Sequence, residues 1–63
     1  MNTNKLKGIM AEHNATQKDL AKILGISEST AHRKLKRGSF TTEEAQKLID
    51  CWMIKDPIDI FLR

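Results

Sequence analysis

The stretch that decides the fold is TQKDLAKILGISESTAHRKLKRG, residues 16–38. Thr16 followed by Asp19 has the approximate spacing of a capping box, which marks the start of a helix. The apolar side chains that follow form one helical face: Leu20, Ala21, Ile23 and Leu24. Gly25 ends this helix, because glycine adopts the left-handed backbone conformation without a Cβ penalty. Residues 16–25 therefore predict a helix that stops in a tight turn.

A second helix follows this turn at once. Ile26 is an apolar residue that plugs the angle between the two helices, and Ser27 is a natural N-cap for a helix that runs to about Lys36. At about 100° per residue, Ala31 and Leu35 turn inward together. The outward side chains are then Ser29, Arg33 and Lys36, flanked by Thr30, His32 and Arg37. The second helix thus presents a polar and basic face.

Further helices are expected on both sides. Leu6, Ile9 and Met10 have the i, i+3, i+4 spacing of a short helix that starts after residues 2–4 and fades near residues 13–14. Thr41 and Glu44 match a second capping box. A 3.6-residue stripe after it predicts a fourth helix and its core side: Ala45, Leu48, Ile49, Trp52 and Met53.

The last segment, PIDIFLR at residues 57–63, fits two structures. Asp56 and Pro57 suit the N-cap and first position of a helix. Ile58, Ile60 and Leu62 also alternate as they would in a strand, so the pattern leaves both open. With no repeat and no linker, residues 1–63 predict one all-α domain of four to five helices.

Composition excludes several classes of protein. The chain has 63 residues, 40% of them hydrophobic, and no apolar run near the roughly 20 residues that span a bilayer. No secretory signal is evident at the N-terminus, so a cytoplasmic location is expected. The single Cys51 cannot form an internal disulfide, and together with two histidines it falls short of four zinc ligands. We expect no metal, no cofactor and, in the absence of a nucleophile motif, no enzyme.

The charges are unevenly distributed along the chain. Residues 1–38 hold eight Lys or Arg against three Asp or Glu, a net charge of +5. Residues 39–63 hold three against five, a net charge of −2, which together give the total of +3. A polyanion is expected to meet the N-terminal part.

The residues around the turn resemble a known family. The pattern is Gln17, Leu20, Ala21, Leu24, Gly25, Ile26, Ser27, Thr30, Ala31 and Leu35. It resembles the helix-turn-helix of the lambda-type repressor and Cro superfamily, the XRE class of phage and bacterial regulators. The resemblance covers most of the chain and implies a lambda repressor-like fold. It also implies a sequence-specific transcriptional regulator of double-stranded DNA, with a phage-type, Cro-like repressor as the main hypothesis.

In a helix-turn-helix, the second helix lies in the major groove and its N-terminal part reaches the base edges. The base contacts expected on this ground are Ser27, Glu28, Ser29, His32 and Arg33. Arg33 is the expected anchor, because a guanidinium that pairs with guanine O6 and N7 discriminates by roughly 1 to 3 kcal/mol. Glu28 either accepts from a cytosine amine or only favours the helix N-terminus.

Phosphate contacts are expected from a second set of side chains: Gln17, Lys18, Lys34, Lys36 and Arg37. Gln17 stands where the family's matching glutamine clamps the DNA backbone, next to the exposed amides of a helix N-terminus. The four basic side chains add affinity but little sequence information.

The expected partner is an operator with inverted-repeat half-sites, bound by a homodimer that forms in solution or only on DNA. The apolar C-terminal residues offer a dimer surface or else close the monomer core: Trp52, Ile58, Ile60, Phe61 and Leu62. Two other functions stay open. One is a protein-interaction module of the same fold, of antirepressor or antitoxin type, and the other is a nonspecific DNA-packaging protein.

Overall fold

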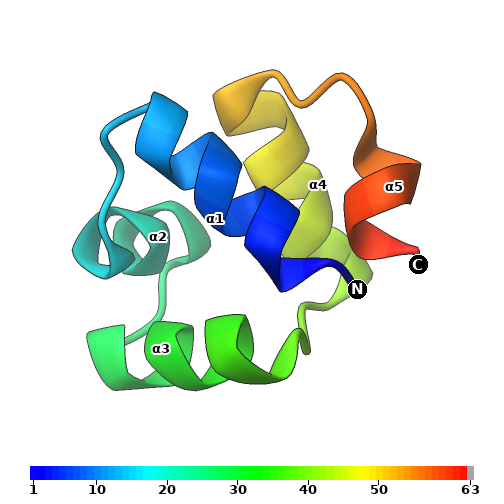
Figure 1. Ribbon diagram of the computed structural model, residues 1–63. Coiled ribbons are helices and arrows are strands. Elements are labelled where there is room, and N and C mark those ends of the chain that lie inside the picture. The colour runs from blue at the N-terminus through cyan, green and yellow to red at the C-terminus, as the bar shows by residue number, and fades with distance from the viewer. Residues whose placement is uncertain (63) are drawn as a thin grey trace.

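The computed structural model describes residues 1–62 and folds them into five α-helices, with no strand in that range. The helices are α1 Thr3–Glu12, α2 Gln17–Leu24, α3 Glu28–Arg37, α4 Thr42–Trp52 and α5 Pro57–Phe61 (Figure 1). The all-α prediction is confirmed.

Helix α3 lies at one edge of the molecule (Figure 1). Figure 1 shows α2 beside α3, and the loop between α4 and α5 at the opposite end. The N-terminus packs against α5, because the Asn2 backbone N–H donates to the Ile60 carbonyl at 2.7 Å and Lys5 pairs with Asp59. The Gly38 backbone also lies close to the N-terminus, where an added Cβ would be 3.3 Å from both Met1 Cβ and Thr3 Cγ2.

One hydrophobic core joins all five helices. Its buried members are Leu6, Met10, Leu20, Ala21, Leu24, Ala31, Leu35, Leu48, Trp52, Ile54 and Ile60. Three leucines from different helices, Leu6, Leu20 and Leu48, are completely buried. Burial of each such side chain contributes about 2 kcal/mol to the free energy of unfolding.

Local capping fixes where the helices begin. The Thr16 hydroxyl accepts from the Asp19 backbone N–H while the Asp19 carboxylate accepts from the Thr16 N–H, and Thr41 and Glu44 form the same reciprocal pair. Both predicted capping boxes are confirmed. Ser27 caps α3 by accepting from the Thr30 backbone N–H at 3.2 Å.

Three helices end in a left-handed residue that turns the chain back. Gly25 after α2 has φ 69° and Gly38 after α3 has φ 66°, as glycine allows. Met53 after α4 has φ 50°, and the next backbone N–H, that of Ile54, donates to the Ile49 carbonyl at 3.1 Å. This turn corrects the prediction that Met53 belongs to the core: its side chain is 82% exposed, and Ile54 is buried instead.

Pro57–Phe61 of the last segment form a helix rather than a strand, and Arg63 lies outside the described residues. Pro57 stands in the first turn of α5, although the Asp56 side chain makes no capping hydrogen bond. The helical twist separates the alternating apolar residues, so that Ile60 is 3% exposed while Ile58 is 64% and Leu62 is 76% exposed. Trp52 and Ile60 therefore belong to the monomer core and drop out of the expected dimer surface.

Candidate nucleic-acid interface

The turn between α2 and α3 sets the position of α3. Ile26 N–H donates to the Ala21 carbonyl at 3.0 Å across Gly25, and Ala21 is 5% exposed where the two helices meet. On α3, Ala31 and Leu35 are buried as the wheel predicts. This packing holds the opposite side of α3 toward solvent.

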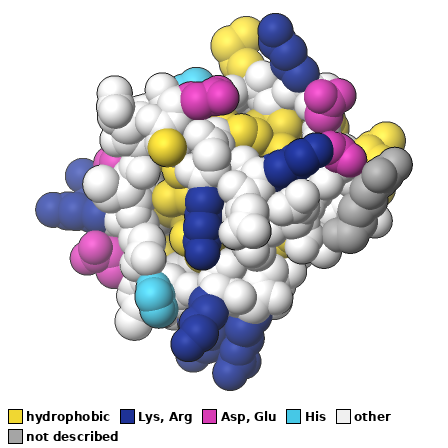
Figure 2. Space-filling view, in the orientation of Figure 1, with side chains coloured by type: hydrophobic (Ala, Val, Ile, Leu, Met, Phe, Trp, Pro, Cys, Tyr) yellow, Lys and Arg dark blue, Asp and Glu magenta, His cyan; other side chains and the backbone are white. Residues whose placement is uncertain are grey.

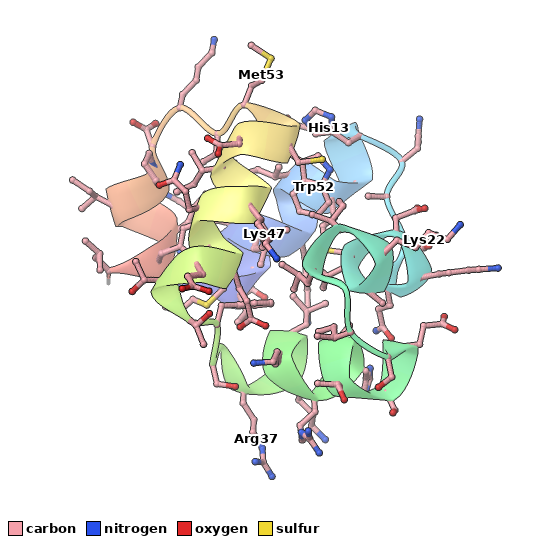
Figure 3. The ribbon with its side chains drawn as sticks, turned by 180° about the vertical axis from the view of Figure 1, so that it is seen from behind. His13, Lys22, Arg37, Lys47, Trp52 and Met53 are labelled. Carbon is pink, nitrogen blue, oxygen red and sulfur yellow. The ribbon has the colours of Figure 1, made fainter. Side chains whose placement is uncertain are left out.

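The solvent side of α3 gathers most of the predicted contact residues. The exposed side chains there are Glu28, Ser29, His32, Arg33, Lys36 and Arg37. Figure 2 shows Lys and Arg side chains gathered along this edge of the molecule, and Figure 3 shows Arg37 pointing away from the protein body. The ten residues of α3 make a rod about 15 Å long whose outer side is positively charged toward its C-terminal end.

Ser27 differs from the other expected base contacts, because its hydroxyl is engaged in the helix start. This hydroxyl accepts from the Thr30 backbone N–H and donates to Thr30 Oγ1 at 2.8 Å. It also lies 3.3 Å from the Ser29 hydroxyl. We therefore assign Ser27 to capping and leave base reading to the residues that follow it.

Gln17, the first residue of α2, contacts the exposed face of α3. Its side-chain oxygen Oε1 lies 3.1 Å from Nδ1 of His32, a residue fifteen positions later in the chain. Lys18 follows on α2 and is exposed. The structure thus brings together an expected phosphate contact, Gln17, and an expected base contact, His32. Sequence spacing does not show such a contact, because it depends on how α2 packs on α3.

Lys34 stands apart from the other basic residues of α3. Its Nζ donates to Glu44 Oε1 at 2.9 Å, and the two side chains are 21% and 13% exposed. On the helix wheel Lys34 lies at one edge of the buried stripe, on the side that faces α4. The pair ties α3 to α4 and engages the Lys34 ammonium group in the free protein, unlike Lys36 and Arg37.

Two carboxylates near the interface have lowered pKa values. The Thr16 backbone N–H and hydroxyl hold the pKa of Asp19 below its ordinary value of 3.8, and Lys22 and Lys18 lower it further. Burial tends to raise the pKa of Glu44, but hydrogen bonds from the Thr41 N–H and from Lys34 outweigh it, and the pKa lies below 4.5. Both carboxylates belong to capping boxes, Asp19 at the start of α2 and Glu44 at the start of α4.

Two features are absent from residues 1–62, a metal-type cluster of side chains and a membrane-spanning helix. No three His, Cys, Asp or Glu side chains in this range are grouped so as to hold a metal ion. Within the described part of the chain, no helix has the length and apolar character needed to cross a membrane.

Comparison with known proteins finds a family model that matches most of the chain. The family model of the Cro/C1-type HTH DNA-binding domain matches residues 5–55, which include the whole of α2, the turn, α3 and α4. No curated protein and no solved structure matches the chain.

Proposed function

The chain belongs to the Cro/C1-type helix-turn-helix family of DNA-binding domains, and from this we propose that it is a sequence-specific transcription regulator that reads an operator with α3 in the major groove. Binding in this way would let it repress, as a phage-type protein does, by blocking access of RNA polymerase. The exposed row of polar and basic side chains on α3 is the observation that supports the proposal most directly.

The dimensions of α3 suit a major groove. The groove is about 12 Å wide, and a single α-helix with its side chains is about 10 to 12 Å across. Arg33 lies at the centre of the exposed side, opposite Ala31 and Leu35, so it points away from the core. We assign Arg33 to a guanine and Glu28, Ser29 and His32 to neighbouring base edges.

Phosphate contacts would come from both helices of the motif. Gln17 and Lys18 stand at the N-terminus of α2, where the helix dipole favours an anion. Lys36 and Arg37 extend from the last turn of α3. These four side chains would fix the register of the protein on the duplex without reading its sequence.

The size of the domain favours a homodimer on DNA. Its longest dimension is 26 Å, whereas half-sites on one face of a duplex lie about 34 Å apart. One copy does not reach two half-sites, so an operator with an inverted repeat would need a second copy. A two-fold dimer would use the same surface on both copies.

The surface we assign to this contact is the apolar groove between α4 and α5. It has a volume of about 290 Å³, and its apolar lining includes Phe40, Ile49, Ile58, Phe61 and Leu62. Gly38, the C-cap of α3, also lines it. A second copy seated here would therefore lie at the C-terminal end of α3 and would set its own α3 on the same side of the dimer.

Sedimentation of the protein mixed with an inverted-repeat duplex measures how many copies bind and so tests the dimer. Ile58→Lys is expected to weaken the two-copy complex at least tenfold and to leave binding to a single half-site unchanged. Met53→Lys is the matched control, since Met53 is also an exposed apolar residue but lies outside the groove. Equal effects of the two substitutions would exclude this surface.

Selection of bound duplexes from a random pool, at about 150 mM salt to weaken nonspecific binding, tests the function itself. The proposal predicts an enriched inverted repeat. Retention of DNA without enrichment would indicate a packaging protein, and no retained DNA would indicate a protein-interaction module.

A further inference from the structure

The contact between Gln17 and His32 determines how the imidazole ring can bind. Gln17 Oε1 lies 3.1 Å from His32 Nδ1. A carboxamide oxygen only accepts hydrogen bonds, so this contact requires a hydrogen on Nδ1. In the neutral ring the other nitrogen, Nε2, then has a lone pair and no hydrogen.

We propose that Gln17 is a positioning residue that holds His32 in the Nδ1–H tautomer, so that His32 Nε2 acts as an acceptor and selects a base with an exocyclic amino group. In the major groove such groups are adenine N6 and cytosine N4. The inference rests on the proposed function for its base-reading half, whereas the tautomer is a property of the free protein.

The orientation of the Gln17 side chain supports this arrangement. With Oε1 toward the imidazole, the Gln17 amide NH₂ points the other way and has two hydrogens to donate. Gln17 is the first residue of α2, where the proposed phosphate would lie. The flipped carboxamide would turn its oxygen lone pairs toward the phosphate, which cannot donate to them. DNA binding and the Nδ1–H tautomer therefore favour the same orientation of Gln17.

His32 and its neighbour Arg33 differ in the hydrogen bonds that they can make. Arg33 has only donors and suits the guanine acceptors O6 and N7. His32 in the Nδ1–H form would offer an acceptor beside it, and guanine and thymine present acceptors that repel it. The two neighbouring side chains would thus read opposite hydrogen-bond patterns on neighbouring bases.

Long-range ¹H–¹⁵N correlation spectra of the free protein test the tautomer, at a pH where the spectrum itself shows a neutral ring. We expect the hydrogen on Nδ1 of His32 in the wild type, and a shift toward the Nε2–H form in Gln17→Met. His13, which stacks on Trp52, is the internal reference and is expected to be unchanged. An Nε2–H form in the wild type, or a tautomer indifferent to Gln17→Met, would overturn the proposal.

The base preference of each variant on the selected operator tests whether His32 reads a base with an amino group. Gln17→Glu keeps an acceptor for Nδ1 but repels the phosphate, so at a pH where the ring is neutral in both variants we expect lower affinity with the preference for adenine or cytosine retained. Gln17→Met is expected to lower affinity and also to reduce that preference, from about tenfold to near none. An unchanged preference in Gln17→Met refutes the base-reading half. Failure to select any operator refutes the proposed function and that half together, and leaves the tautomer result standing.

Discussion

Lys34 Nζ lies 2.9 Å from Glu44 Oε1, and the same carboxylate oxygen accepts from the Thr41 backbone N–H at 2.9 Å. One side chain therefore both caps α4 and anchors α3 to it. The orientation of the outer face of α3 depends on this contact and on the turn at Gly25.

The Lys34–Glu44 pair is expected to contribute to stability. Glu44→Ala removes the ion pair and half of the capping box, and should lower the free energy of unfolding by about 1 to 2 kcal/mol. Lys34→Met removes only the pair and should cost less, about 0.5 to 1 kcal/mol. Urea unfolding of both variants and of the double variant measures the coupling. Strict additivity of the two losses would show that the contact has no energetic role.

Stability should fall in acid through the same carboxylates. Because the pKa values of Glu44 and Asp19 are lowered in the folded state, their contributions are complete above the ordinary values of 4.5 and 3.8 and are lost as the pH falls through the folded values. We expect the free energy of unfolding to decline below about pH 4.5. Glu44→Gln should show a smaller decline over that range than the wild type. An identical acid profile in the variant would contradict the assignment to Glu44.

Substitutions at two positions with left-handed backbone, Met53 and Gly25, should change the free energy of unfolding in opposite directions. Met53→Gly is expected to raise the free energy of unfolding by about 0.5 to 1 kcal/mol, because it relieves a backbone conformation that costs an L-residue about 1 to 2 kcal/mol. Gly25→Ala should lower it by about 1 kcal/mol, and this cost would come from the backbone alone, since nothing lies within 4 Å of the added Cβ. Thermal unfolding of both variants checks the pair, and a destabilising Met53→Gly would mean that the exposed side chain contributes to packing.

The salt dependence of DNA binding should separate the basic residues of α3. Arg37→Met is expected to reduce the slope of log affinity against log salt by about 1, as for a lost phosphate contact. Lys34→Met should leave the slope unchanged, because Lys34 is paired with Glu44. Lys55→Met is the control for general charge, since Lys55 lies in the loop at the end of the molecule opposite α3 (Figure 1). Equal slopes for Arg37→Met and Lys55→Met would remove Arg37 from the interface.

The parts of the fold that were predictable depend on residues near each other in the sequence. Thr16 with Asp19 and Thr41 with Glu44 define helix starts within three residues, and Gly25 and Gly38 define two helix ends. The end of α4 has the same backbone turn without a glycine. A helical wheel therefore places Met53 in the core. The missed signal is the apolar residue that directly follows the turn, Ile26 at the end of α2 and Ile54 at the end of α4.

The contacts between helices were beyond the sequence pattern. His32 and Lys34 lie about 80° to either side of the buried centre of α3, by the helical periodicity of about 100° per residue. Both positions look alike on a wheel, and both residues were expected to face DNA. The structure places α2 beside one and α4 beside the other, so that His32 contacts Gln17 and Lys34 contacts Glu44. Only the packing of the neighbouring helices distinguishes them.

Base reading by α3 in a major groove is best tested by measuring how tightly the wild type and Arg33→Ala bind the selected operator. The same affinities are measured for every single-base-pair change in that operator. Arg33→Ala is expected to lose roughly 1 to 3 kcal/mol of discrimination at one symmetric guanine position in each half-site and to keep its preferences elsewhere. A uniform loss of affinity at all positions, with every base preference retained, would show that Arg33 contacts the backbone and does not read a base edge.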